Sequence, residues 1–196
     1  MQKIILASNN KGKIAEIQEA LGDTIHLVPQ DDFNIEEADE NMPTFVENAL
    51  LKARHAAKQS NLPAIADDSG LVVDVLNGAP GIFSARYGGP EKNPETNIQK
   101  LIENLMPFKS LEQRKAYFYC ALVYVKNAED PVPLICQGKW EGNILFAPQG
   151  QFGFGYDPVF WVPTHQCSAA ELSMEEKNRI SHRAQALGEL KRRLTE

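Results

Sequence analysis

Two adjacent carboxylates interrupt an apolar stretch of the sequence, and this interruption constrains the fold more than any other feature. Residues 64–76 read AIADDSGLVVDVL, with Asp67 and Asp68 between two apolar runs. Such runs are typical of buried strands, here one or two strands over 64–66 and 70–76. We therefore expect the acids at a strand end, either in a solvated hairpin turn or in a binding site.

The rest of the chain alternates between strand and helix patterns, which predicts a mixed α/β fold with helices on a sheet. Two capping pairs, Thr44 with Glu47 and Ser173 with Glu176, mark helix starts. The sequence shows no repeat, linker or low-complexity tract, so we expect one domain over residues 1–196. The predicted strands cover 3–8, 23–29, 116–125, 133–145 and 158–163. The predicted helices cover 14–21, 43–60, 94–105, 169 onwards and 182–194. Residues 77–89 are rich in Gly and Pro, which predicts a loop of defined shape.

Composition and charge exclude several classes of function. The net charge is −6 and the sequence pI is about 5.3, which argues against a broad nucleic-acid surface. A few local lysines can still hold a small anionic ligand. No apolar run approaches the roughly 20 residues that span a bilayer, and the first residues lack a signal-peptide pattern. The three cysteines, Cys120, Cys136 and Cys167, lack the spacing of a disulfide framework or zinc site, so we expect a cytoplasmic protein.

The hexapeptide SNNKGK, Ser8 to Lys13, lies between a predicted strand and a predicted helix. A helix N-terminus offers unpaired N–H groups and a partial positive charge, which suit a phosphate. Gly12 allows close backbone approach, and Lys11 or Lys13 can add a point charge. The hexapeptide is not a Walker A loop, and taken alone it is more typical of a simple capping turn.

A second acidic segment, the EEADE run at residues 36–40, offers further carboxylates besides the acid pair at 67–68. Mg²⁺ prefers oxygen ligands and usually takes one or two carboxylates together with substrate phosphates. One carboxylate can then hold the metal while its neighbour orients or deprotonates water. The alternative from the residues alone is a solvated turn.

The glycine-rich segment FGFGYD, residues 152–157, places Phe154 between two glycines. An aromatic ring with free space above it can stack on a nucleobase. The same pattern is explained by a tight loop whose aromatic side chain packs into the core.

A basic segment, EEKNRISHR at residues 175–183, enters the last predicted helix. Lys177 and Arg183 only donate hydrogen bonds, so with His182 they favour a phosphate or a base that carries carbonyl oxygens. A merely solvated charge run is the alternative.

In this order, the motifs resemble the inosine triphosphate pyrophosphatase family, also described as dITP/XTP or non-standard purine NTP pyrophosphatases. The resemblance is carried by SNNKGK, FVENALLKA, ADDSGL, GAPGIFSARYGG, FGFGYDPVF and SHRAQAL, and the wording around ADDSGL is similar to the bacterial branch. It implies a long, twisted mixed central sheet with flanking helices that form two lobes around a cleft. It also implies Mg²⁺-dependent hydrolysis of ITP, dITP or XTP to the monophosphate and pyrophosphate, by a homodimer.

The resemblance also implies roles for individual residues. Asp68 matches a residue that is both Mg²⁺ ligand and proton acceptor, and Glu40 matches a second ligand, with Asp39 as the alternative register. Lys52 matches a lysine near the phosphates, and Ser69 matches a substrate contact. The triphosphate-binding element matches Ser8, Asn9, Asn10, Lys11, Gly12 and Lys13, and the nucleobase pocket matches Phe154, Gly155, Tyr156, Asp157, Lys177, His182 and Arg183.

Two other functions compete with this interpretation. The Maf-like nucleotide pyrophosphatases open with S-x-S-x-x-R, where this chain has Asn10 and Lys13. A non-catalytic nucleotide-binding module is the second, although it would not need Asp68 together with both lysines. A Nudix hydrolase is excluded, because its G-x₅-E-x₇-R-E-x-x-E-E pattern is missing.

Overall fold

The protein, seen in a computed structural model that describes residues 3–22 and 25–195, is built around a mixed seven-stranded sheet. Within these residues the strand order is β2-β1-β3-β4-β5-β6-β7. β1 pairs in parallel with β2 and β3, whereas β6 pairs antiparallel with β5 and β7. The predicted mixed α/β class is confirmed. Asp23 and Thr24, at the start of the predicted second strand, lie outside the described residues.

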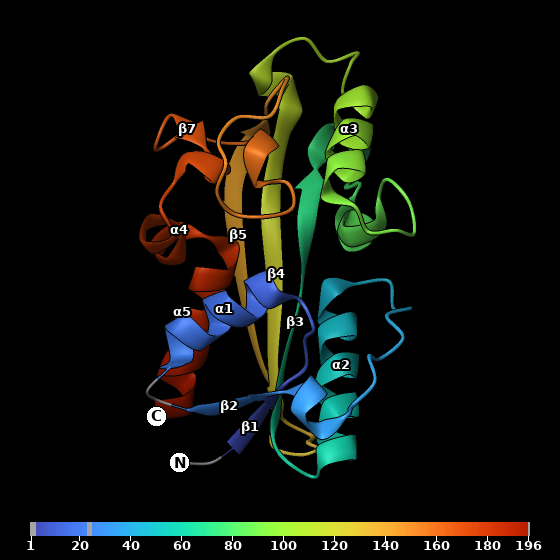
Figure 1. Cartoon of the computed structure of the whole chain (residues 1–196), viewed down its shortest axis with the longest axis vertical. Helices are drawn as coiled ribbons and strands as arrows, with labels where there is room; N and C mark the ends of the chain where they lie inside the picture. Colours follow the sequence, from blue (N-terminus) through green and yellow to red (C-terminus); the bar gives the residue numbers. More distant parts are fainter. Residues whose placement is uncertain (1–2, 23–24, 196) are drawn as a thin grey trace. The chain divides into compact units, whose positions relative to one another are not determined.

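The elements of Figure 1 follow the predicted order along the chain. The strands are β1 (Lys3–Leu6), β2 (His26–Pro29), β3 (Ala64–Val73), β4 (Lys115–Val125), β5 (Leu134–Ile144), β6 (Phe160–Val162) and β7 (Cys167–Ser168). The helices are α1 (Lys11–Leu21), α2 (Phe45–Ser60), α3 (Pro94–Asn104), α4 (Met174–Ile180) and α5 (His182–Thr195). No helix among residues 3–22 and 25–195 is both long and apolar enough to cross a bilayer.

Side-chain caps explain where the helices begin. The Thr44 hydroxyl accepts the Glu47 N–H at 3.2 Å and donates to the Glu47 carboxylate at 2.6 Å, which starts α2. Ser173 and Glu176 form the predicted capping box of α4. Asn10 caps α1, because its side-chain oxygen accepts the Lys13 N–H.

Two local predictions were wrong. The acids at 67 and 68 do not lie at a strand end, because β3 runs without a break from Ala64 to Val73. The loop predicted over 77–89 contains a 3₁₀ helix, Gly81–Arg86. The Ser84 hydroxyl stabilises this helix by donating to the Gly81 carbonyl at 2.6 Å and accepting the Leu71 N–H at 2.9 Å.

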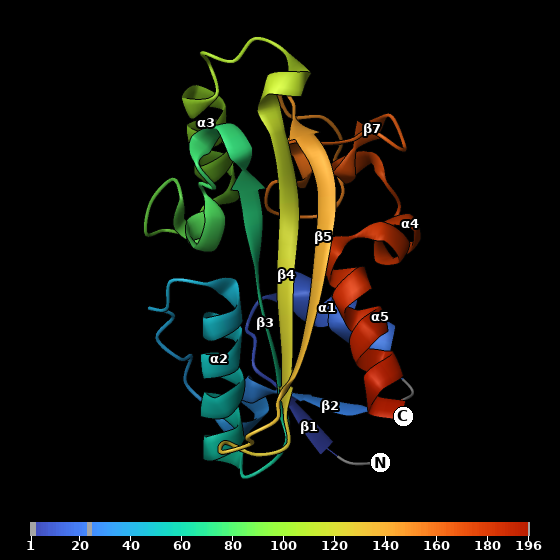
Figure 2. The ribbon, with the colours of Figure 1, turned by 180° about the vertical axis from the view of Figure 1, so that it is seen from behind.

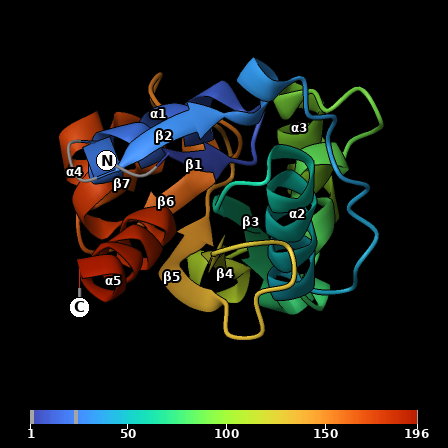
Figure 3. The ribbon, with the colours of Figure 1, turned by 90° about the horizontal axis from the view of Figure 1, so that it is seen from below.

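The chain separates into two compact units, and each has its own core. Unit 1 comprises Met1–Ser69, Cys120–Gly138 and Arg183–Glu196. Its apolar cluster joins α1 and α5 to the sheet, and Figures 2 and 3 show α2 on the other side of the strands from α5. The main side chains of this cluster are Ile4, Leu6, Ile17, Leu21, Ile65, Leu122, Leu187 and Leu190.

Unit 2 comprises Gly70–Tyr119 and Lys139–His182. Its core packs α3 and the segment around β6 against the parts of β3, β4 and β5 that belong to this unit. Aromatic rings contribute much of this core. The main side chains are Leu71, Val73, Leu101, Leu105, Phe118, Trp140, Ile144, Val159 and Phe160.

Candidate active site

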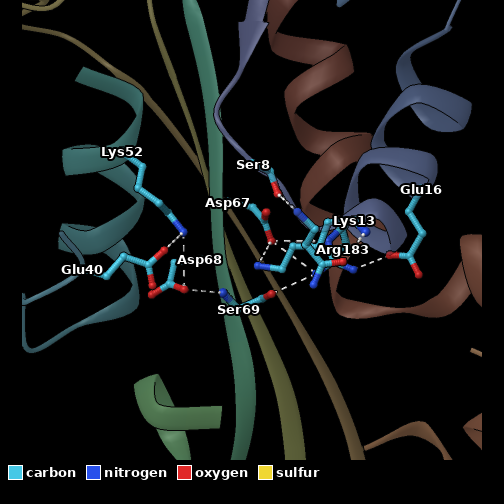
Figure 4. Close-up of polar contacts among 10 residues, drawn as sticks. Ser8, Lys13, Glu16, Glu40, Lys52, Asp67, Asp68, Ser69 and Arg183 are labelled. Atoms are coloured by element: carbon cyan, nitrogen blue, oxygen red, sulfur yellow. Dashed lines mark hydrogen bonds and ion pairs between the residues drawn. The ribbon is translucent and has the colours of Figure 1, made fainter. Parts of the chain in front are cut away.

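The alternation of side chains along β3 sends Asp67 and Asp68 to opposite faces of the strand. Figure 4 shows Asp67 on the side of α1 and α5, and Asp68 on the side of α2. The two carboxylates therefore belong to separate clusters, both within unit 1. A strand tolerates two acids in its interior here because each face supplies its own cations.

Asp67 lies in a largely buried ion network, although its Oδ1 has no hydrogen-bond partner among the described residues. Its Oδ2 is 3.1 Å from the Lys13 ammonium and 3.3 Å from Nη2 of Arg183. Arg183, which is 1% exposed, also pairs with Glu16 of α1 and donates to the Ser69 hydroxyl at 2.9 Å. The network thus ties α1, β3 and the start of α5 together.

Charge pairing decides the protonation states in this network. Burial alone would raise the pKa of Asp67, but Lys13 and Arg183 outweigh it and hold that pKa well below its usual range. Burial would likewise lower the pKa of Arg183, and the neighbouring Asp67 and Glu16 raise it instead. Both groups are therefore charged at neutral pH.

Glu16 was missed by the sequence analysis. It is buried on the inner face of α1 beside Ile17, and its carboxylate pairs with the equally buried Arg183. The available signal was its spacing, because Glu16 lies three residues after Lys13 on one helical face. An acid on the apolar face of a helix usually has a buried partner.

Asp68 lies in a second cluster, with Lys52 of α2 and Glu40 of the acidic loop (Figure 4). Nζ of Lys52 is 2.7 Å from Oε1 of Glu40 and 3.8 Å from Oδ1 of Asp68. The Ser69 N–H also donates to Oδ1 of Asp68, at 3.0 Å. Ser69 therefore contacts both clusters, through its hydroxyl on one side and its amide on the other.

Electrostatics differ in this second cluster. Burial raises the pKa of Asp68, and the nearby ammonium of Lys52 only partly opposes it. Burial would also raise the pKa of Glu40, but Lys52 lowers it overall. The pKa of Lys52 rises, since Asp68, Asp67 and Glu40 outweigh the effect of its burial. The carboxylate of Asp68 is thus the member whose charge is least compensated.

The donor set of this cluster fits Mg²⁺. Oδ2 of Asp68 is buried and has no hydrogen-bond partner within the described ranges 3–22 and 25–195. Glu40, whose side chain is 34% exposed, provides a second oxygen donor on the same side of β3. Two carboxylates are what Mg²⁺ usually takes from a protein when phosphates and waters complete its shell. Asp39, the alternative ligand, instead accepts a hydrogen bond from the Asn41 amide at 3.4 Å.

The segment Ser8–Lys13 forms the capping turn of α1. The Ser8 hydroxyl accepts the Asn10 N–H at 3.3 Å, and the Asn9 side chain accepts from Gln30 at 2.8 Å. Asn9, Asn10 and Lys11 are exposed, and Gly12 and Lys13 are half-buried. A capping turn and a phosphate loop are compatible, because the turn exposes the N-terminus of α1. The phosphate contact stays a prediction.

Three residues predicted for the nucleobase lie together in unit 2. Phe154 is 37% exposed between Gly153 and Gly155, which have φ values of 74° and 60°. Oδ2 of Asp157 accepts the Phe154 N–H at 2.8 Å and the Lys177 ammonium at 2.7 Å. The same ammonium lies 4.6 Å from the centre of the Phe154 ring, so the loop, the acid and the lysine form one unit.

The remaining predicted base contacts have other surroundings. The Tyr156 hydroxyl is buried and donates to the Ser84 carbonyl at 2.8 Å, which anchors the loop. His182 is buried and stacks on Phe118. The guanidinium of Arg183 contacts Asp67, as described above. Their predicted contacts with a base stay predictions.

Comparisons with known proteins give consistent results. A sequence model of the Ham1 family matches residues 4–193. The dITP/XTP pyrophosphatase of Escherichia coli (strain K12) is 54% identical over 188 residues, covering 95% of each chain. A HAM1 protein structure from Coxiella burnetii has a TM-score of 0.93 and 52% identity, covering 100% of this chain and 99% of that one. The Ham1 protein of Staphylococcus aureus has a TM-score of 0.88 and 39% identity, covering 99% and 98%.

Proposed function

Because the chain belongs to the Ham1 family, we propose that it hydrolyses non-standard purine nucleoside triphosphates (ITP, dITP and XTP) to the monophosphate and pyrophosphate. The observation that carries the proposal is the match to the Escherichia coli protein named dITP/XTP pyrophosphatase, at 54% identity over 95% of both chains. In the cell, this activity would remove deaminated purines from the nucleotide pool.

The phosphate chain is assigned to unit 1. Lys13 and Lys52 are mostly buried, with side chains 16% and 12% exposed, so their charges are concentrated at fixed positions. Together with the N-terminus of α1, they bind the β- and γ-phosphates. They also stabilise the charge that the leaving pyrophosphate carries. Positioning and electrostatics thus supply most of the catalysis.

Asp68 and Glu40 are the residues that would hold Mg²⁺, and Asp68 is the proton acceptor for the attacking water. The orphaned Oδ2 of Asp68 supports both roles, since it is the buried acid oxygen on this face that no described group satisfies. When bound, Mg²⁺ would neutralise polyphosphate charge and weaken the bond to the leaving group. Water attacks the α-phosphorus, and Asp68 takes its proton.

The base is assigned to Phe154, Lys177 and His182. Phe154 stacks on the purine, and a nitrogen donor pairs with the 6-oxo group of hypoxanthine or xanthine. Adenine carries a 6-amino donor instead and would leave that protein donor unpaired. Sites built on such polar matching can discriminate by about 10⁴–10⁵. Guanine also has a 6-oxo group, and its rejection needs a wall against its 2-amino group.

A panel of nucleotides tests the proposal. Purified protein is mixed with ITP, dITP, XTP, GTP, ATP, dUTP and TTP, with and without Mg²⁺, and pyrophosphate is measured. We expect release from ITP, dITP and XTP only, and only with Mg²⁺. Preference for dUTP or TTP would favour the Maf-like function. Tight ITP binding without pyrophosphate would favour the non-catalytic module.

A second measurement tests the base contact. We expect Phe154→Ala to weaken ITP binding by about 1–3 kcal/mol while leaving kcat nearly unchanged. Unchanged ITP affinity would show that the stacking assignment is wrong. The homodimer, the cytoplasmic location and the single domain with two lobes stay predictions.

A further inference from the structure

His182, one of the predicted base contacts, stacks on an aromatic side chain that the sequence analysis placed only within a strand. The imidazole of His182 and the ring of Phe118 have centroids 4.9 Å apart and planes inclined by 13°. Both side chains are buried, at 6% and 7% exposure. Near-parallel rings at this separation attract one another, so Phe118 restricts the plane in which the imidazole lies.

Phe118 is itself held in place by two other rings of the unit 2 core. Its centroid is 4.6 Å from that of Phe160 and 6.2 Å from that of Trp140, and the latter two are 5.2 Å apart. A Cβ atom on Gly142 would lie 2.6 Å from Cζ of Phe160, so the glycine leaves the space that this ring fills. In a core packed this densely, Phe118 cannot tilt without displacing its neighbours.

The orientation of an imidazole matters for base recognition, because its ring nitrogens donate or accept only in the plane of the ring. An imidazole that tilts out of this plane points its N–H away from the acceptor and weakens the hydrogen bond. At position 6, a 6-oxo purine accepts a hydrogen bond, whereas a 6-amino purine donates one. Discrimination between them therefore needs an imidazole held in one plane.

We propose that Phe118 is a positioning residue for base recognition: its ring fixes the imidazole plane of His182 against the purine. The inference rests on the proposed function, because it takes His182 as a base contact. Phe118 does not touch the base and acts only through His182. The other two rings of the cluster, Phe160 and Trp140, support Phe118 from the core.

The substitution Phe118→Leu tests this role, since it keeps an apolar side chain and removes the flat ring. We expect KM for ITP to rise about tenfold, the value of one good hydrogen bond, with kcat within about twofold of the wild type. The preference for ITP over ATP should fall by a similar factor. Phe118→Tyr, which keeps the ring, should restore both values.

Leu101→Val is the control, because it trims a fully buried apolar side chain of the same unit 2 core that takes no part in the ring contacts described for Phe118. It should lower Tm about as much as Phe118→Leu without changing the ITP preference. The imidazole NMR resonances of His182 should shift in Phe118→Leu and remain nearly unchanged in Leu101→Val. These resonances report ring orientation, which a merely structural loss would not alter selectively.

The outcomes separate the two proposals. If Phe118→Leu loses stability but keeps the ITP preference and the His182 resonances, then Phe118 only fills the core and the inference is wrong. If the wild type releases no pyrophosphate from ITP, the proposed function is wrong. Calorimetric titration with ITP and ATP, which needs no turnover, then decides whether Phe118 controls the choice of base.

Discussion

The two faces of β3 carry adjacent aspartates with opposite properties. On one face, Asp67 is fully buried, its pKa is lowered, and three charged groups (Lys13, Arg183 and Glu16) form its network. On the other face, Asp68 has a raised pKa, and its cation, Lys52, is 3.8 Å away. Each of the two carboxylates has one buried oxygen without a hydrogen-bond partner in the described part of the chain.

This difference indicates a structural role for one of the two adjacent aspartates and a chemical role for the other. A carboxylate beside two cations, as Asp67 is beside Lys13 and Arg183, is a weak base, because these neighbours stabilise the charged form. A carboxylate with a raised pKa, as burial gives Asp68, is better suited to accept a proton. We infer that Asp67 maintains the site and Asp68 performs the chemistry.

Removal of Mg²⁺ should have the largest effect on activity, because the proposed metal site lies on the Asp68 face of β3. We expect excess EDTA to abolish pyrophosphate release from ITP, because the polyphosphate charge is then not neutralised. Added Mg²⁺ should restore the rate. Full activity in metal-free buffer would mean that the Asp68 face works without a cation.

Asp68→Asn should lower kcat by about 10²–10⁴-fold, since the amide cannot accept the proton. Its Tm should stay within about 2 °C of the wild type. Burial already disfavours the charge of Asp68, and Lys52 retains its ion pair with Glu40. Turnover and thermal unfolding are measured on the same preparation. Near-normal turnover would place the proton acceptor elsewhere.

In contrast to Asp68→Asn, the substitution Asp67→Asn should cause a large loss of stability. Removing one partner from a buried ion pair costs about 3 kcal/mol or more. In a chain of this size, that loss lowers Tm by about 6–12 °C. A Tm equal to that of Asp68→Asn would remove the distinction between the two faces.

Glu16→Gln should have the smallest effect, because Arg183 retains its ion pair with Asp67 after the change. We expect a loss of about 1.5 kcal/mol, or about 3–6 °C in Tm. Glu19→Gln, at an exposed position of the same helix, is the matched control and should leave Tm within about 1 °C. Equal Tm values for the two variants would show that Glu16 does not support the network.

Much of the fold followed from local patterns. The caps at Thr44 and Ser173 and the apolar strand runs located most elements, because these signals act over a few residues. The unbroken β3 was not predicted, since aspartate is disfavoured in strands and only distant cations stabilise it there. Those cations come from α1, α2 and α5, and no local pattern shows that they converge.

The site shows the same limit. The residues that resemble family motifs were assigned by their type and order, and Lys13, Lys52, Glu40 and Asp68 lie in the two clusters on β3. Glu16 and Phe118 were not assigned, because each depends on packing between elements distant in sequence. Supporting residues of this kind follow from tertiary contacts.

The double role of Ser69 limits which residues can replace it in related sequences. Its hydroxyl accepts from Arg183 and its amide donates to Asp68. Alanine would retain the amide bond and lose the hydroxyl, threonine would retain both, and proline would retain neither. Tolerance to substitution at this position should therefore rank threonine above alanine and alanine above proline.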